Sequence, residues 1–298
     1  MTTIEQNPTD HPATPRSDRL RRAFFRFSQS KLSMLGAAIV ALVVFFTIFG
    51  TVLAPYPAHV AGSVDTASRF LPPSAAHPFG TNELGQDVLS LVMAGTTVSV
   101  LAGLAVVLIG SAIGTLVGAI AGFSRGWVDE ALMRVTDLTL TIPGLILAMA
   151  IAAALGAGFG NMVIAIALSW WPGYARLVRG EVLAAREEVY VTAARALGAT
   201  PKRILFRHIL PNVVSPIIVK MSLDMGFAIL TVAGLGFIGI GVRPPTPEWG
   251  TLLSISRSYM PDYWWTAMAP GMAMFLAVFG FNLLGDGLRD VLDPKARR

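Results

Sequence analysis

The chain has 298 residues, of which 54% are hydrophobic and 14% are charged, and its mean hydropathy of +0.62 is too high for a soluble globular domain of this length. The lipid bilayer is therefore the expected solvent. The formal net charge of +5 reports orientation in the membrane rather than a nucleic-acid site, because no basic stripe is interleaved with stacking aromatic residues. The absence of cysteine excludes disulfides, thiolate metal sites and a cysteine nucleophile.

The first 30 residues are predicted to form a cytoplasmic region of their own. Residues 1–15 are polar and contain prolines, a composition that cannot bury a core. Leu20, Phe24 and Phe27 follow at helical spacing among arginines, which predicts an amphipathic helix on the cytoplasmic membrane surface. Because this region has no apolar stretch followed by small residues, no cleaved signal peptide is expected.

Stretches of about 20 residues with few charges predict an all-α integral membrane protein with about six transmembrane helices. The first span and the long extracytoplasmic loop after it form a second region, residues 31–94. The other five spans form a third region, residues 95–298. The predicted spans cover residues 32–53, 96–121, 135–155, 162–177, 213–240 and 266–285.

The second span carries glycines at intervals of four, which places them on one flat face of the helix. They are Gly110, Gly114, Gly118 and Gly122. Helices in lipid associate through close backbone packing, so this face predicts a tightly packed neighbour. We expect that neighbour to be another helix of the same chain rather than a second subunit.

The distribution of basic residues predicts the orientation of the chain. Arginine and lysine concentrate near both termini and in the loop of residues 176–208, which places these parts in the cytoplasm of a multi-pass protein. The loop before the last span carries Tyr259, Tyr263, Trp264 and Trp265, whose amphipathic rings suit the outer interface.

Motifs of soluble enzymes occur without the context that they require. The G-x-S-x-G match at residues 122–126 lies between two spans, and the G-x-G-x-x-G match at residues 234–239 closes a span. The histidines show no metal-ligand spacing, so no metal site is expected. No phosphate-binding loop occurs, so the chain is expected to be non-catalytic, to bind no cofactor and to rely on another polypeptide for any use of ATP.

The cytoplasmic loop of about residues 186–211 predicts two short helices joined by a tight turn. Residues 186–197 are good helix formers, and Gly198 can end that helix. Thr200 can cap the next helix, Pro201 fits its first turn, and Pro211 is predicted to stop it.

This loop is predicted to form a compact knob that presents the small residues Ala193 and Ala194 on its surface. Such a knob suits docking into a cleft of a partner protein. A merely solvated loop is the alternative that the residues alone leave open.

The same loop resembles the E-A-A-x3-G-x9-I-x-L-P loop of ABC importer permeases, which contacts the nucleotide-binding subunit. Two positions depart from that pattern: Thr192 replaces the acidic residue, and His208 occupies the isoleucine position with Ile209 beside it. The resemblance implies that the residues coupling this chain to an ATPase are Thr192, Ala193, Ala194, Gly198, Leu210 and Pro211.

Three further motifs, in order along the chain, resemble the C-type permease of the dipeptide, oligopeptide and nickel transport family. They lie at residues 77–87, 244–250 and 282–294, and the likeness runs from about residue 30 to the C-terminus. In the first motif, Asn82 and Gln86 stand where the family usually has Asp and Arg.

The resemblance implies a type I ABC importer permease-like bundle in the bacterial inner membrane, with residues 95–298 as its core. It implies a second homologous permease subunit, two ATP-binding cassette subunits that bind the ATP, and an extracytoplasmic solute-binding protein. Dipeptides or oligopeptides are the expected substrates, and nickel or a metal chelate is the alternative within the same family.

A secondary transporter is a competing hypothesis, because Lys220 and Asp224 lie one turn apart inside the fifth span. Their spacing lets them neutralise each other, so we expect a structural pair, with a cavity-lining role as the alternative. A membrane scaffold without transport activity is a third hypothesis, which leaves the knob unexplained.

Overall fold

The computed structural model of the chain describes residues 25, 27–124 and 126–292. That part of the chain is built from helices and contains no β-strand, only an isolated bridge between Thr81 and Asp87. The prediction of an all-α protein is confirmed. Residues 1–24 and 26, which hold the predicted tail and most of the predicted amphipathic helix with Leu20 and Phe24, lie outside the described residues.

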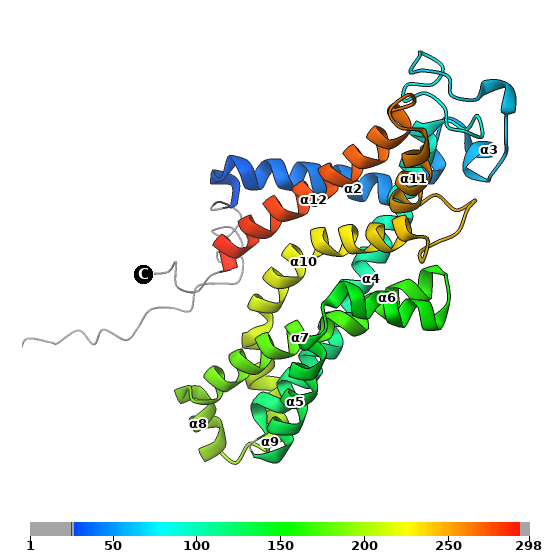
Figure 1. Cartoon of the computed structure of the whole chain (residues 1–298). Coiled ribbons are helices and arrows are strands. Elements are labelled where there is room, and N and C mark those ends of the chain that lie inside the picture. Colours follow the sequence, from blue (N-terminus) through cyan, green and yellow to red (C-terminus); the bar gives the residue numbers. More distant parts are fainter. Residues whose placement is uncertain (1–24, 26, 125, 293–298) are drawn as a thin grey trace, which may run out of the picture.

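Five long helices make up most of the fold, and shorter helices connect them (Figure 1). The long helices are α2 (Lys31–Leu53), α4 (Val88–Phe123), α7 (Phe159–Arg186), α10 (Leu210–Ile238) and α12 (Trp265–Leu292). The shorter α-helices are α3 (Pro57–Val60), α5 (Trp127–Thr141), α6 (Gly144–Leu155), α8 (Val189–Ala196), α9 (Pro201–Arg203) and α11 (Trp249–Ser256). Two 3₁₀ turns, Thr66–Ser68 and Arg257–Tyr259, and one π-helical turn, Ile204–Ile209, complete the described helices.

In the described residues, four helical stretches are long and apolar enough to cross a membrane: α2, α4, α12 and the continuous stretch Pro201–Ile238. The third predicted span is not straight, because α5 and α6 meet at an angle of 91°. If this bent pair of helices is counted as one span, the number of candidate spans is five. The break falls at Ile142 and Pro143, since proline cannot donate the backbone hydrogen bond that would continue the helix.

The fourth predicted span lies within α7, which is not among those four stretches. This helix is longer than the predicted residues 162–177 and includes Trp170, Trp171, Pro172 and Arg176, which lower its hydropathy. The described residues therefore contain four or five candidate spans rather than about six, and α7, much of which is covered by other helices, is the predicted span that is not among them.

The predicted glycine face of α4 packs against α7 of the same chain. A Cβ added to Gly114 would meet the carbonyl oxygen of Trp171 and the Cβ of Tyr174, and one added to Gly118 would lie 3.0 Å from the backbone nitrogen of Arg179. The glycines therefore let the two backbones approach more closely than any side chain would permit. The expectation of packing within the chain is confirmed.

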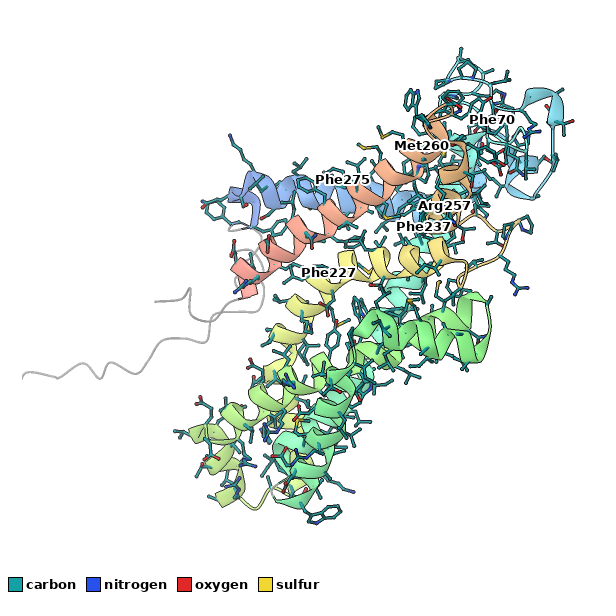
Figure 2. All side chains as sticks on the ribbon, in the orientation of Figure 1. Phe70, Phe227, Phe237, Arg257, Met260 and Phe275 are labelled. Carbon is teal, nitrogen blue, oxygen red and sulfur yellow. The ribbon has the colours of Figure 1, made fainter. Side chains whose placement is uncertain are left out.

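The helices enclose two apolar clusters. The larger one joins α2, α4, α6, α7, α10, α11 and α12 around the buried residues Val106, Ile166, Ile229 and Trp249. The smaller one, around Val178, Val191 and Ile209, holds α8 and the π-helical turn against α7. Figure 2 labels two large apolar side chains, Phe227 on α10 and Phe275 on α12, which are 60% and 57% exposed, and such exposure suits a surface in contact with lipid.

Candidate functional site

The turn between α8 and α9 has the backbone geometry that the sequence predicts. Gly198 has a φ of +80°, a conformation that favours glycine, and it ends α8. The hydroxyl of Thr200 accepts a hydrogen bond of 3.4 Å from the amide of Arg203, and Pro201 is the first residue of α9. Figure 1 shows α8 and α9 at the end of the molecule opposite to α3. This knob, about residues 186–211, is thus a defined structure rather than a loose loop.

The two alanines of the knob do not share one environment. Thr192 and Ala193 are exposed, but Ala194 is buried, so the prediction that both alanines lie on the surface is wrong for Ala194. The helix α8 is amphipathic, and Val191 and Ala194 lie one turn apart on the face that packs into the smaller apolar cluster. The buried alanine holds α8 in place, and the surface is left to Thr192 and Ala193.

Pro211 does not stop the second helix, so that prediction is also wrong. The chain passes from α9 through the π-helical turn Ile204–Ile209 directly into α10, where Leu210 and Pro211 form the first turn. The amide of Leu210 donates to the carbonyl of Leu205, five residues earlier. The wider turn accommodates a proline that cannot donate a hydrogen bond, so the helix continues from the knob into the membrane span.

Three apolar side chains are exposed on the surface of the knob, and none of them belongs to the loop motif described above. Val189, Leu197 and Phe206 are 82%, 87% and 60% exposed. In the sequence, these apolar residues lie within an otherwise charged loop, and this position could have indicated an exposed contact surface. Together with Ala193 they give the knob an apolar contact surface, which we call the knob surface.

Arginines of α7 bind acidic residues of α5 and carbonyl groups of α4. Arg179 forms a two-pronged pair with Asp129, at 2.6 and 2.7 Å, and Arg176 lies 2.7 Å from Asp137. Arg186 donates to the carbonyl oxygens of Gly122 and Phe123 at 3.3 Å. The pairs with Asp129 and Asp137 were not predicted, because their members lie 50 and 39 residues apart in the sequence.

Lys220 and Asp224 form the ion pair that their spacing predicts. The Nζ of Lys220 lies 3.0 Å from the Oδ2 of Asp224, and the two side chains are 32% and 17% exposed. The same Nζ lies 4.9 Å from the centre of the Tyr174 ring on α7, a cation–π contact. The pair is therefore partly covered by α7, and the rest of it faces out of the chain.

At the opposite end of the molecule, the loop before α4 is folded around Asp87. This carboxylate caps α4 by accepting from the amide and hydroxyl of Ser90 at 2.8 and 2.7 Å. His77 Nδ1 lies 3.0 Å from Asp87 Oδ1, and His59 Nδ1 accepts from the Asp87 amide at 2.9 Å. Through these contacts the two histidines hold the loop against the start of α4.

Asn82 and Gln86, the two departures from the family motif, bind each other. The Asn82 amide donates to Gln86 Oε1 at 2.9 Å, and the Gln86 amide donates to the carbonyl of Ser63 at 2.9 Å. Both side chains are buried. A neutral pair therefore occupies this place in the loop, and it leaves no buried charge that needs a partner.

The motif at residues 244–250 also forms part of this end. Glu248 is completely buried and accepts hydrogen bonds from the amide of Gly250 at 2.8 Å and from the hydroxyl of Ser99 at 3.0 Å. The indole of Trp249 donates to the carbonyl of Val92 at 3.1 Å. The motif thus joins α11 to α4 at the end of the bundle opposite to the knob.

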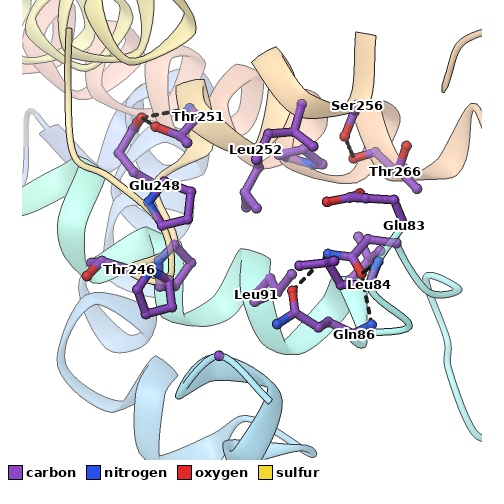
Figure 3. A pocket seen from close by; sticks show the side chains of 18 residues that line it. Glu83, Leu84, Gln86, Leu91, Thr246, Glu248, Thr251, Leu252, Ser256 and Thr266 are labelled. Atoms are coloured by element: carbon purple, nitrogen blue, oxygen red, sulfur yellow. Dashed lines mark hydrogen bonds between the residues drawn. The ribbon is translucent and has the colours of Figure 1, made fainter. Parts of the chain in front are cut away.

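A cavity of about 270 Å³ lies between this motif and the loop before α4. Figure 3 shows Glu83 and Leu84 on one side of it and Thr246 and Glu248 on the other. Burial raises the pKa of the Glu83 carboxyl, and Arg69 opposes this effect. The lining is mostly apolar and includes two carboxyl residues, Glu83 and the fully buried Glu248.

Comparison with known protein families and proteins gives consistent results. The family described as "Binding-protein-dependent transport system inner membrane component" matches residues 114–298, and the family described as "N-terminal TM domain of oligopeptide transport permease C" matches residues 19–73. A probable D,D-dipeptide transport system permease protein, DdpC of Escherichia coli (strain K12), is 46% identical over 90% of this chain and 89% of its own length. A glutathione transport system permease protein, GsiD of Pectobacterium atrosepticum, is 42% identical over 93% of this chain and 91% of its own.

The fold is also similar to a solved structure of the MetNI methionine ABC transporter in an inward-facing conformation. The TM-score is 0.54 at 17% sequence identity, over 67% of this chain and 96% of the transporter chain. This likeness places the helical arrangement among ABC importer permeases.

Proposed function

The chain belongs to the binding-protein-dependent transport system inner membrane components, and from that premise we propose that it forms part of the route by which an ATP-driven importer moves small peptides across the bacterial inner membrane. The observation that supports this proposal is the similarity, over at least 90% of the chain, to permeases for a D,D-dipeptide and for glutathione. Both substrates are small peptides that carry a free ammonium group and at least one free carboxylate group.

The proposed complex contains a second homologous permease, two cassette subunits that bind and hydrolyse ATP, and an extracytoplasmic solute-binding protein. This chain has no catalytic role in that scheme. The knob surface supports the contact with a cassette subunit, because Val189, Leu197 and Phe206 are apolar and highly exposed at one end of the chain. With the knob in the cytoplasm, both termini are cytoplasmic as well.

The continuity of the helix explains how movement of the knob reaches the membrane. The stretch Pro201–Ile238 runs without interruption through the π-helical turn, and Val191 and Ala194 pack α8 against that turn. A tilt imposed on the knob by a closing cassette subunit is therefore transmitted to α10. Coupling depends on the shape of the knob, and Ala193 and Gly198 contribute because they are small and because Gly198 has a positive φ.

The test is uptake by the complete complex in proteoliposomes, with the solute-binding protein outside and ATP within reach of the cassette subunits. We expect ATP-dependent uptake of radiolabelled alanyl-alanine, and no uptake of ⁶³Ni²⁺. Uptake of nickel without peptide uptake would assign the chain to the other branch of the family. Peptide uptake that is driven by an ion gradient without ATP would instead support a secondary transporter.

A further inference from the structure

Two ion pairs of this chain are partly exposed on helices that belong to the membrane bundle. Lys220 and Asp224 of α10 are 32% and 17% exposed, and Arg176 of α7 and Asp137 of α5 are 61% and 55% exposed. A charged side chain on a lipid-facing surface costs several kcal/mol, so such groups face a partner protein or water.

The depth of the α10 pair is set by the packing of its neighbours. Lys220 lies over Tyr174, which packs against Gly114, and Gly114 precedes Ala121, the end of the second span that the sequence predicts, by seven positions. Seven residues of helix correspond to about 10 Å. In a hydrocarbon core about 30 Å thick, the pair is therefore well inside the membrane.

The two pairs lie along one strip of the surface. Lys220 approaches Gly173 of α7, where an added Cβ would lie 3.9 Å from the lysine Nζ. Gly173 and Arg176 are three residues apart and share a face of α7. One turn further, Gly180 is exposed and has open space around it. We define the charged strip as Asp137, Arg176, Lys220 and Asp224.

We infer that the charged strip lines the water-filled route through which the substrate passes, and that its paired charges suit a zwitterionic peptide with a free ammonium and a free carboxylate group. The inference rests on the proposed function and names the part of the chain that meets the substrate. The strip holds two cations and two anions at ion-pair distance. A passing zwitterion can contact a carboxylate and a cation of the strip at the same time, so neither terminus crosses the membrane without a partner.

The alternative is that the second permease subunit covers the strip. The geometry favours water, because each charge is already paired within this chain and requires nothing from another subunit. The two possibilities differ in whether a small polar reagent can reach the strip.

Cysteine labelling in the complete complex tests this inference, because the chain contains no cysteine of its own. Gly173→Cys places a thiol beside Lys220 and leaves both ion pairs intact, and an added Cβ there has no contact shorter than 3.8 Å. Ile218→Cys is the matched control on α10, since its side chain is 42% exposed but lies on the opposite side of the helix from Lys220. The probe is a charged methanethiosulfonate reagent, applied to the complex in lipid nanodiscs.

We expect Gly173→Cys to react at least about tenfold faster than Ile218→Cys, a difference equal to about 1.4 kcal/mol. During ATP-driven turnover with alanyl-alanine on the solute-binding protein, the reaction at Gly173→Cys should slow several-fold, because the peptide occupies the route. An unreactive Gly173→Cys in a complex that still takes up peptide would show that a partner covers the strip, and would overturn the inference. Reactivity that is the same with and without peptide would also overturn it.

A double variant separates a substrate role from a structural role. Lys220→Met with Asp224→Leu removes both charges, and we expect about a tenfold loss of alanyl-alanine uptake per folded complex, with the cassette subunits still bound. The exchange Lys220→Asp with Asp224→Lys keeps a pair and should restore part of the uptake. Unchanged uptake per folded complex in the double variant would show that the pair is structural. If the wild-type complex takes up no peptide at all, the proposed function has failed instead.

Discussion

The packing of α4 against α7 gives a sharp prediction, because two glycines of the same helix face differ in the space around them. A Cβ at Gly110 would lie 3.6 Å from the nearest atom of α7, an ordinary contact. A Cβ at Gly114 would meet the Trp171 carbonyl and the Tyr174 Cβ, and would lie 2.9 Å from the backbone nitrogen of Ala175. Backbone atoms and a Cβ cannot rotate away, so the helices would have to move apart.

Gly114→Ala is therefore expected to destabilise the fold relative to Gly110→Ala. Both substitutions remove the same penalty of glycine in a helix, up to about 1 kcal/mol, so that contribution cancels in the comparison. The remaining difference is the cost of overpacking, about 1 to 3 kcal/mol. This corresponds to a roughly 5- to 150-fold difference in the ratio of folded to unfolded protein.

The measurement is equilibrium unfolding in mixed detergent micelles by titration with sodium dodecyl sulfate, followed by the fluorescence of the six tryptophans. Gly110→Ala should match or exceed the stability of the wild type. Equal midpoints for the two alanine variants would refute the reasoning, because they would mean that α4 and α7 do not approach as closely as the structure shows.

Three further predictions concern the knob, the ion pair of α10 and the loop before α4. Gly198→Val should reduce peptide uptake at least about tenfold without loss of membrane insertion, because a β-branched residue resists a positive φ. In purified complexes it should also weaken cassette binding or peptide-stimulated ATP hydrolysis. Lys220→Met alone should lower folded yield more than the double change with Asp224→Leu, since it leaves a carboxylate unpaired at a cost of about 3 to 5 kcal/mol in a buried site. Glu83→Gln should raise thermal stability at pH 7 by less than about 1 kcal/mol, because the carboxyl is partly solvated.

Each of these predictions has an outcome that would contradict it. Wild-type assembly, stimulated hydrolysis and uptake in Gly198→Val would exclude the knob as the coupling element. Equal folded yields of the single and double variants would mean that Lys220 and Asp224 do not pair. Burial raises the folded-state pKa of Glu83, so its ionisation costs stability once the pH exceeds its ordinary value of about 4.3, and the advantage of Glu83→Gln should disappear below that pH. An advantage that is independent of pH would point to another cause.

The sequence by itself determined the features that depend on neighbouring residues or on the solvent. Apolar stretches of about 20 residues and the placement of arginine and lysine predicted a membrane bundle, and the helices lie where these stretches are. The interval of four between Gly110 and Gly122 predicted a close helix contact, because that interval alone defines a face. The end of α8 at Gly198 and the cap at Thr200 were also predictable, since both depend on local backbone geometry.

Only the tertiary structure decided features that join distant parts of the chain. Ala194 is buried because the π-helical turn packs beneath α8, and Pro211 continues the helix because that turn absorbs its missing hydrogen bond. The contact of Glu248 with Ser99 spans 149 residues, and the pairing of Arg176 with Asp137 spans 39. Sequence patterns report which residues share a face of one helix. They do not report which helix that face meets, because the meeting is decided by the packing of the whole bundle.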